Sequence, residues 1–337
     1  MRIGGANGDG IDSAGIMLSR IFKKLGYWVF AFRGYQSVIR GGVVWYQVRF
    51  SNEKLYSYGN DIDILIALTK EAVEESISLV KANGLLIYDS SLPNIANRQD
   101  IKIMPLPLTE LAIKAGGSIY RNTVSIGIIC KLLGIDPNFA KDMLLAKFKK
   151  SPELMESNAK AFDLGYGSVE RQSIAIPKPG NAGKYLINGN TALARGAYAA
   201  GCKFYAAYPM TPASSIMEWF AKHEELGVFF KQTEDEIAAI NMVIGASSAG
   251  VRAMCGTSGG GFSLMVEALG LAGMIEVPIV VVESQRTGPS TGLPTKTEQG
   301  DLLFVTHASQ GDFPRIVLAP RSIEECFYLG AKAFNLA

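Results

Sequence analysis

Short apolar runs alternate with amphipathic runs along almost the whole chain, and this alternation restricts the possible folds more than any other feature. Apolar residues recur at helical spacing over Ile11–Leu25, whereas Ile62–Leu68 has the length and the β-branched content of a buried strand. Strands that alternate with helices favour parallel sheets with helices on both faces. We therefore predict an α/β protein with two doubly wound, mainly parallel-sheet domains, the first of them Rossmann-like.

The individual elements follow from the same two periodicities. Further strands are predicted at Tyr27–Phe32, Val43–Phe50, Gly84–Tyr88, Ile103–Leu106, Lys203–Ala207, Val228–Lys231, Arg252–Gly256, Pro278–Glu283 and Ile316–Ala319. Further helices are predicted at Lys70–Ala82, Asn122–Leu133, Pro137–Lys150, Pro152–Leu164, Thr191–Ala200, Ser214–His223, Glu234–Ala249, Phe262–Met274 and Ile323–Leu336.

Periodicity disappears between Arg171 and Asn190, where Pro177, Pro179 and Gly180 cluster. Proline and glycine at this density are typical of a linker between domains. We expect one domain over residues 1–170, a linker over 171–189 and a second domain over 190–337.

Composition excludes several classes of protein. The 337 residues are 48% hydrophobic and carry a net charge of +2, which provides no field to attract nucleic acid or an anionic membrane. No apolar run reaches the roughly 20 residues of a spanning helix, and Met1–Gly5 is a strand entering a glycine turn and not a signal peptide. We expect a cytoplasmic protein with neither nucleic-acid nor membrane partners.

Cysteine and histidine residues are few and scattered. No CxxC pair occurs among Cys130, Cys202, Cys255 and Cys326, and the two histidines, His223 and His307, lie far apart. Because zinc and iron–sulfur sites need clustered ligands, we expect no metal site built from this chain alone.

The stretch Tyr208–Ser215 stands between a strand and a helix. Thr211 is suited to cap that helix and Pro212 to occupy its first turn. A helix start with free N–H groups and a hydroxyl can bind a small carboxylate. The alternative is a well-capped helix with no further role.

Three other segments of the second domain carry candidate residues. Thr233 and Glu236 have the spacing of a capping box, so Glu236 has a structural alternative to a catalytic role. Thr257–Gly261 is either a simple turn or backbone that a ligand approaches closely. The long polar loop Gln285–Lys296 follows a buried strand, and Arg286 at its start is suited to bind a carboxylate.

The glycine-rich opening Gly4–Gly10 joins a strand to a helix, an arrangement that can present N–H groups to phosphate. Its glycines do not follow the dinucleotide pattern, and Arg33 stands where NAD needs an acidic residue. Gly8-Asp9-Gly10 resembles the start of a thiamine-diphosphate magnesium motif, but the asparagine that this motif needs is absent between Arg33 and Trp45. Arg33 and Arg40 lie near strand ends, where a phosphate-bearing ligand is one alternative and a solvated loop the other.

Together these segments resemble the α subunit of 2-oxoacid:ferredoxin oxidoreductases, in the form with a γ domain fused ahead of the pyrimidine-binding domain. The matching stretches, over nearly the whole chain, are Gly4–Gly10, Ser37–Gly42, Tyr208–Ser215, Glu234–Gly250 and Gln285–Asp301. The last three are specific in combination. Met210, Ala213, Gly260 and Gln310 depart from the family's usual Ile, Ser, Pro and His, which leaves the preferred oxoacid open.

The resemblance implies that thiamine diphosphate lies between this domain and a β subunit. Glu236 would be catalytic and cofactor-binding, with its carboxyl bonded to N1′ of the aminopyrimidine so that the imino tautomer is favoured. Ser258 and Gly259 would also contact the cofactor. Thr211 and Arg286, with Tyr208 and Pro209 beside them, would bind the substrate carboxylate.

The implied reaction is oxidative decarboxylation of a 2-oxoacid to acyl-CoA and CO2, with electrons passed to ferredoxin. Gly8, Gly10 and Arg40 are the candidate residues for coenzyme A. Mg²⁺ and a [4Fe-4S] cluster would be held by the β partner in an αβ or (αβ)2 assembly, so this chain alone should be inactive. The family continues beyond the helix that ends near Ala337, and we expect an incomplete second domain.

Two other functions remain open on the residues alone. One is a nicotinamide-dependent dehydrogenase with two Rossmann-like domains, against which the glycine order and Arg33 argue. The other is a non-catalytic α/β ligand-binding protein, in which Thr211 and Glu236 would only cap helices.

Overall fold

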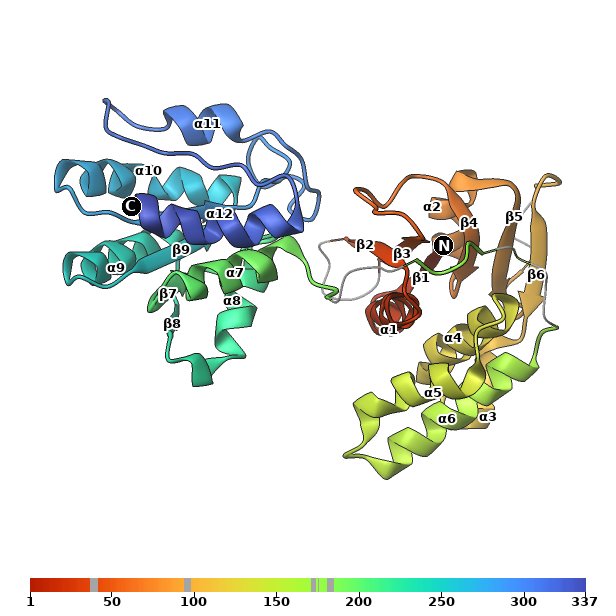
Figure 1. Ribbon diagram of the computed structural model, residues 1–337. Helices are drawn as coiled ribbons and strands as arrows, with labels where there is room; N and C mark the ends of the chain where they lie inside the picture. Colours follow the sequence, from red (N-terminus) through yellow and green to blue (C-terminus); the bar gives the residue numbers. More distant parts are fainter. Residues whose placement is uncertain (37–41, 94–97, 171–173, 175, 181–184) are drawn as a thin grey trace. The chain divides into compact units, whose positions relative to one another are not determined.

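Two sheets organise the chain, one in each of two units, Met1–Leu186 and Ile187–Ala337 (Figure 1). The computed structural model describes residues 1–36, 42–93, 98–170, 174, 176–180 and 185–337. Each sheet is covered by helices on both faces, and parallel pairing dominates, so the predicted fold class is confirmed. No helix among the described residues combines the length and the apolar character that a membrane crossing requires.

The first sheet has the strand order β2-β3-β1-β4-β5-β6. Its strands are β1 (Arg2–Ala6), β2 (Trp28–Gly34), β3 (Val43–Ser51), β4 (Ile62–Ala67), β5 (Val80–Asp89) and β6 (Lys102–Leu106). Strands β1, β4, β5 and β6 pair in parallel, whereas β3 pairs antiparallel with both β1 and β2. The antiparallel pair β2–β3 thus extends a parallel sheet at one edge.

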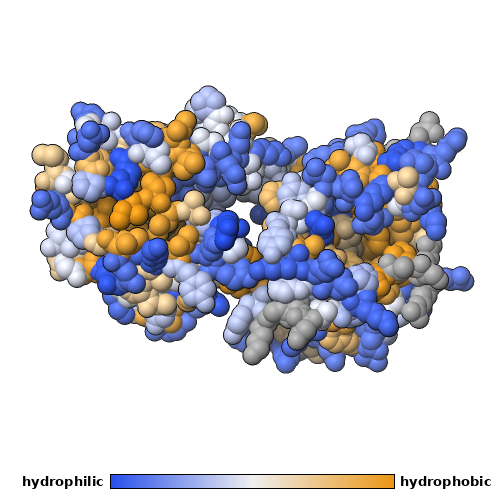
Figure 2. Space-filling model, turned by 45° about the horizontal axis from the view of Figure 1, so that its top comes forward, coloured by the Kyte–Doolittle hydropathy of each residue, from blue (hydrophilic) through white to orange (hydrophobic). Residues whose placement is uncertain are grey.

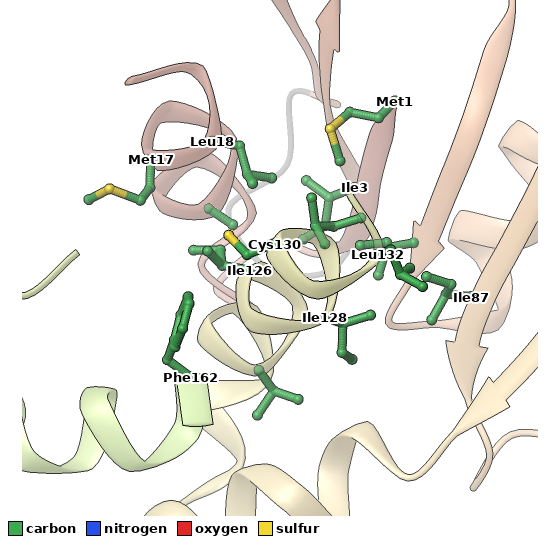
Figure 3. Close-up of a cluster of buried hydrophobic side chains, with 14 of the residues drawn as sticks. Met1, Ile3, Met17, Leu18, Ile87, Ile126, Ile128, Cys130, Leu132 and Phe162 are labelled. Carbon is green, nitrogen blue, oxygen red and sulfur yellow. The ribbon is translucent and has the colours of Figure 1, made fainter. Parts of the chain in front are cut away.

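Helices cover both faces of this sheet: α1 (Ile11–Lys24), α2 (Lys70–Ser76), α3 (Leu108–Ala115), α4 (Arg121–Leu132), α5 (Pro137–Leu145) and α6 (Pro152–Gly167), with 3₁₀ turns at Ile77–Leu79, Ser118–Tyr120 and Ala146–Phe148. Side chains alternate between the faces, so Ile64 and Ile66 join one core while Leu65 and Ala67 join the other. Figure 3 shows the larger core, where side chains from β1, α1, β5, α4 and α6 meet.

The second sheet is parallel throughout, with the order β10-β9-β7-β8. Its strands are β7 (Phe204–Ala207), β8 (Phe229–Gln232), β9 (Ala253–Thr257) and β10 (Val280–Glu283), and its helices are α7 (Gly189–Ala199), α8 (Ser214–Ala221), α9 (Glu236–Ser248), α10 (Gly259–Met274), α11 (Leu302–His307) and α12 (Ile323–Leu336), with a 3₁₀ turn at Glu224–Leu226. Residues of α9 and α10 share one core with the sheet, and residues of α7, α8 and α12 share the other. Because the four strands are parallel, all of their carboxyl ends lie at one edge of the sheet.

Two predicted elements differ from the structure, and two short helices were not predicted. The helix predicted at Lys70–Ala82 ends at Ser76, because β5 already begins at Val80 and pairs there with Ile62. The strand predicted at Ile316–Ala319 was wrong: this run pairs with no described strand, and Ile316 is exposed. The helices α3 and α11 were not predicted, since they have only 8 and 6 residues and too few turns for a clear periodicity.

Helices α4 and α6 cross at two glycines. A Cβ on Gly127 would overlap the backbone of Phe162 and lie 2.9 Å from the nitrogen of Tyr166, and one on Gly165 would overlap the backbone of Val124. The helices can approach this closely only because both positions lack a side chain.

We expect Gly127→Ala to destabilise the first unit by about 2 kcal/mol, because the added methyl group forces α4 and α6 apart. Gly167→Ala is the matched control, since a Cβ there meets no atom within 4 Å. Urea denaturation followed by tryptophan fluorescence measures both variants. Equal stability of the two variants would show that the helices tolerate a side chain at the crossing.

Candidate active site

The loops that leave the carboxyl ends of β7, β8, β9 and β10 gather at one edge of the second sheet, where ligands of open parallel sheets bind. Every candidate residue predicted in the second unit lies on these loops or at the first residue of the helix that follows: Tyr208, Pro209, Thr211, Glu236, Ser258, Gly259 and Arg286. The parallel arrangement alone therefore brings together segments that are up to 78 positions apart, from Tyr208 to Arg286.

Arg286 and Thr211 are in direct contact. The Arg286 side chain is only 4% exposed, and its Nη1 donates to the Thr211 carbonyl oxygen at 3.3 Å. Its Nη2 donates to the Thr291 hydroxyl at 3.5 Å, while Nε is buried without a partner. Tyr208 and Pro209, on the same loop as Thr211, are exposed. A buried guanidinium with an unused donor is suited to an anionic ligand.

The predicted cap of helix α8 was wrong. The helix begins at Ser214, whose N–H donates to the Met210 carbonyl oxygen at 3.1 Å, and no side chain caps it. Residues 211–213 form an extra turn ahead of the helix, so neither Thr211 nor Pro212 stands at the predicted position. Asn190 of α7, which the sequence did not single out, holds this turn through Nδ2, which donates to the Pro212 carbonyl oxygen at 2.8 Å.

The capping box predicted for α9 was also wrong, and the difference concerns Glu236 directly. Asp235 is the cap, because its carboxylate accepts from the Ala238 N–H at 2.7 Å, and the Thr233 hydroxyl donates to the Asp235 carbonyl oxygen at 2.8 Å. Glu236 is therefore the first helical residue, and its side chain is not needed for capping.

The Glu236 carboxyl is 2% exposed, and its Oε1 is buried with no hydrogen-bond partner. Burial raises the pKa of this carboxyl, a hydrogen bond from the backbone of Glu236 itself opposes the increase, the neighbouring Asp235 adds to it and Arg286 opposes it. A buried carboxyl oxygen without a partner costs stability, and such groups concentrate at functional sites. The arrangement supports an acid that donates a hydrogen bond to a ligand.

Gly261 provides the room that Glu236 occupies. A Cβ on Gly261 would overlap the Thr257 hydroxyl and the Glu236 Oε1 and would lie 2.8 Å from the Glu236 Cδ. Ser258, immediately after β9, is fully buried and its hydroxyl has no partner. Two polar groups without partners thus lie at the start of α10, beside a position that excludes every side chain. In the sequence, nothing distinguishes Gly261 from the other glycines of its run.

Two further carboxyl groups, those of Glu283 and Asp301, lie next to Arg286. Glu283 is the last residue of β10, and burial, followed by a hydrogen bond and repulsion from Asp301, raises its pKa to about 8. A Cβ on Gly259, the first residue of α10, would lie 2.9 Å from both carboxylate oxygens of Asp301. No sequence signal marks this pair, because Glu283 has the position of an ordinary strand end.

Two candidate residues of the first unit, Gly8 and Gly10, lie on the β1–α1 loop. Gly8 and Gly10 both have left-handed backbone angles, with φ of 104° and 75°. Between them, the Asp9 carboxylate accepts from the Ala6 N–H at 2.9 Å and pairs with Arg121 at 2.7 Å. Arg33, in contrast, pairs with Asp12 at 2.9 Å. Arg40 and most of the stretch Ser37–Gly42 lie outside the described residues.

Two family models match consecutive parts of the chain. Residues 1–168 match "pyruvate ferredoxin/flavodoxin oxidoreductase", and residues 195–337 match "pyruvate flavodoxin/ferredoxin oxidoreductase, thiamine diP-bdg". Both describe the same class of enzyme, and the second assigns thiamine diphosphate binding to the unit that contains Glu236.

Individual relatives agree with that class. The chain is 34% identical to a 2-oxoacid:ferredoxin oxidoreductase subunit alpha of Sulfolobus sp, over 99% of the chain and 62% of the relative. Over 45% of the chain and 44% of the relative, it is 50% identical to the 2-oxoglutarate synthase subunit KorA of Archaeoglobus fulgidus. The solved structure of 2-oxoglutarate:ferredoxin oxidoreductase from Magnetococcus marinus, with 2-oxoglutarate, coenzyme A and succinyl-CoA bound, superimposes with a TM-score of 0.89 and 36% identity, over 99% of this chain and 60% of that one.

The chain belongs to the 2-oxoacid:ferredoxin oxidoreductase family. It spans about three fifths of the length of the relatives described above that match it over nearly its whole length.

We expect the stability of Glu236→Gln relative to wild type to increase as pH is raised from 4 to 8. A pKa that is raised in the folded state stabilises the fold below the unfolded value of about 4.3, and this contribution is lost as pH rises through the folded value. Glutamine does not ionise, so the variant avoids the loss. Urea denaturation at both pH values measures the difference, and Glu234→Gln, at an exposed neighbour, should show no such dependence. A pH-independent difference for Glu236→Gln would contradict the raised pKa.

Proposed function

We propose that this chain is a subunit of a 2-oxoacid:ferredoxin oxidoreductase, which converts a 2-oxoacid and coenzyme A to acyl-CoA and CO2 and passes the electrons to ferredoxin. The observation that carries the proposal is the Glu236 carboxyl, whose Oε1 is buried without a partner and whose place as the helix cap is taken by Asp235. A purely structural glutamate at a helix start would cap the helix or face water.

The residues around Glu236 fit thiamine diphosphate. A carboxyl whose pKa is raised by burial binds its proton more readily than a free glutamate and can donate it in a hydrogen bond to a ring nitrogen of the cofactor's pyrimidine. The space kept open at Gly261 leaves that carboxyl undisturbed, and the unpaired Ser258 hydroxyl and the Gly259 backbone lie on the adjoining turn. When bound, thiamine diphosphate supplies the carbon nucleophile and the electron sink of the reaction.

Arg286 and Thr211 bind the carboxylate of the oxoacid in this proposal. The Arg286 fork is already fixed by the Thr211 carbonyl oxygen and the Thr291 hydroxyl, so little side-chain freedom is lost when a substrate binds. Tyr208 and Pro209 are exposed on the same loop and border the approach to Thr211. The first substrate to test is 2-oxoglutarate, because one solved relative contains it and another relative is named for it.

Coenzyme A is proposed to contact the first unit at Gly8 and Gly10, and at Arg40, which lies outside the described residues. A Cβ on Gly8 meets no atom within 4 Å, so the backbone there is open to a ligand. Arg121 stands beside this loop and its Nε is buried without a partner. Its charge is partly compensated by Asp9.

A β subunit is the proposed partner, contributing Mg²⁺ and the [4Fe-4S] cluster in an αβ or (αβ)2 assembly that reduces ferredoxin. Apolar side chains gather on the surface of the second unit (Figure 2). Helices α9 and α10 expose Ile237, Met242, Leu264, Leu271 and Met274, the last of them 83% exposed. Exposed apolar patches of this kind support a subunit interface. Cytoplasmic location is proposed because all four cysteines are free thiols, as is usual in a reducing compartment.

The decisive experiment is an anaerobic assay of the complex that co-purifies with this chain from its native cells. Reduction of a low-potential dye by 2-oxoglutarate should require coenzyme A and thiamine diphosphate. Reconstitution with Glu236→Gln should lower kcat by about 100-fold or more, because the acid is lost while the shape is kept. Glu234→Gln is the control. Full activity of Glu236→Gln, or reduction without thiamine diphosphate, would refute the function.

In the same assay, we expect Arg286→Lys to raise KM for the oxoacid by about 10- to 100-fold, because lysine keeps the charge but cannot form the planar fork. Arg195→Lys, at an exposed position of α7, is the matched control. If KM is unchanged and only the Tm falls, Arg286 has a structural role and does not bind the substrate.

A further inference from the structure

Asp301, which directly precedes α11, connects three segments at the edge of the second sheet. Its backbone N–H donates to the Gln285 Oε1 at 3.0 Å, and its Oδ2 accepts from the Arg286 N–H at 3.4 Å. Its carboxylate also lies against Gly259 of α10, where there is no side chain to displace it. One residue therefore joins both ends of the loop 285–301 to the helix that begins beside Ser258.

Glu283 faces the same carboxylate from the end of β10. The Glu283 carboxyl forms a side-chain hydrogen bond with Asp301, and its Oε1 is buried without a hydrogen-bond partner. Two carboxylates at hydrogen-bond distance cannot both ionise without strong repulsion. The facing charged groups are Asp301 and Arg286, while Thr257 on β9 and Gly259 on α10 carry no charge. A hydrogen bond between carboxyl groups needs one proton.

The loop itself is closed by a second set of bonds. The Lys296 carbonyl oxygen accepts from the Thr287 N–H at 2.9 Å and from the Thr287 hydroxyl at 3.0 Å. The Thr291 hydroxyl lies between these residues in the chain and accepts from Arg286. Arg286 is thus held by a loop whose closure depends on Asp301 and on the Thr287–Lys296 pair.

We propose that Glu283 and Asp301 share one proton and act as a positioning pair, which keeps the loop 285–301 closed and holds Arg286 in place for the oxoacid carboxylate. Loss of that proton leaves two facing carboxylates, which repel each other and release the loop. The role of Arg286 in this inference rests on the proposed function, whereas the closure of the loop does not.

The direction of the pH dependence follows from Glu283. Its pKa is raised to about 8, mainly by burial and then by Asp301. A group with a raised pKa stabilises the closed arrangement fully at low pH, and this stabilisation is lost as pH rises through about 8. The loop should therefore be closed at pH 7 and open at pH 9.

Limited trypsin digestion of the full chain tests the loop without any activity. Cleavage after Lys296 needs its carbonyl group, which Thr287 holds in the closed loop. The cleavage rate of wild type is divided by that of Glu283→Gln at the same pH. This ratio should rise up to about tenfold from pH 7 to pH 9, as does the ionised fraction of a group with a pKa of about 8. Glutamine keeps the hydrogen bond to Asp301 and does not ionise.

Two further variants complete the experiment. Asp301→Asn also removes the repulsion and should resemble Glu283→Gln, which covers the case in which one variant fails to fold. Glu225→Gln, exposed near the 3₁₀ turn after α8, should behave as wild type. An equal pH response in wild type and in whichever of Glu283→Gln and Asp301→Asn folds would overturn the positioning pair.

Kinetics of the assembled enzyme test the link between the Glu283–Asp301 pair and the proposed function. KM for 2-oxoglutarate should rise above pH 8 in wild type and stay constant in Glu283→Gln. A loop that opens as expected in a complex that decarboxylates no oxoacid would refute the proposed function and leave the pair intact. A constant wild-type KM from pH 7 to 9 with an active enzyme would refute the link to Arg286.

Discussion

Parallel pairing of four strands is the constraint on which the second unit depends. Because β7, β8, β9 and β10 run in one direction, their carboxyl ends share an edge, and the connections that leave them must all begin there. The loop with Thr211, the start of α9 with Glu236, the glycine-rich start of α10 and the loop with Arg286 are neighbours for this reason. An antiparallel sheet of the same residues would distribute them over two edges.

This edge is also where the unit gives up stability. Four buried polar atoms without partners lie there: Oε1 of Glu236, Oγ of Ser258, Oε1 of Glu283 and Nε of Arg286. Each unpaired buried polar group costs about 1–3 kcal/mol, and the opposite ends of the same strands show no such concentration among the described residues. Burial raises the pKa of two of these groups, Glu236 and Glu283, so the edge favours the protonated form of both carboxyls over the ionised form. The apolar cores on both faces of the sheet supply the stability that makes this arrangement tolerable.

The sequence predicted the sheets well because strand periodicity is a local property. Ile62–Ala67 and Val43–Ser51 carry their own pattern, and each strand needs no distant residue to be recognised. Helix caps were predicted less well, since Thr211 and Thr233 have the right chemistry but each helix begins only three residues later, at Ser214 and Glu236. Glu236 was predicted as catalytic from the resemblance. Only the structure shows that Asp235, and not Thr233 with Glu236, caps the helix. Asp301 and Glu283 escaped prediction because their relation depends on packing against Gly259, 42 positions before Asp301 in the chain.

Gly261 can serve as a marker for an intact acid site among related chains. Its lack of a side chain is what allows the Glu236 carboxyl and the Thr257 hydroxyl to occupy the start of α10 together. Any chain of this fold that acquires a larger residue at that position must move the acid, whatever else it retains. The presence of Glu236 alone is then a poor sign of an intact acid site, and the pair of a glutamate at the start of α9 with a bare position in the first turn of α10 is the informative combination when related genes are sorted into catalytic and non-catalytic copies.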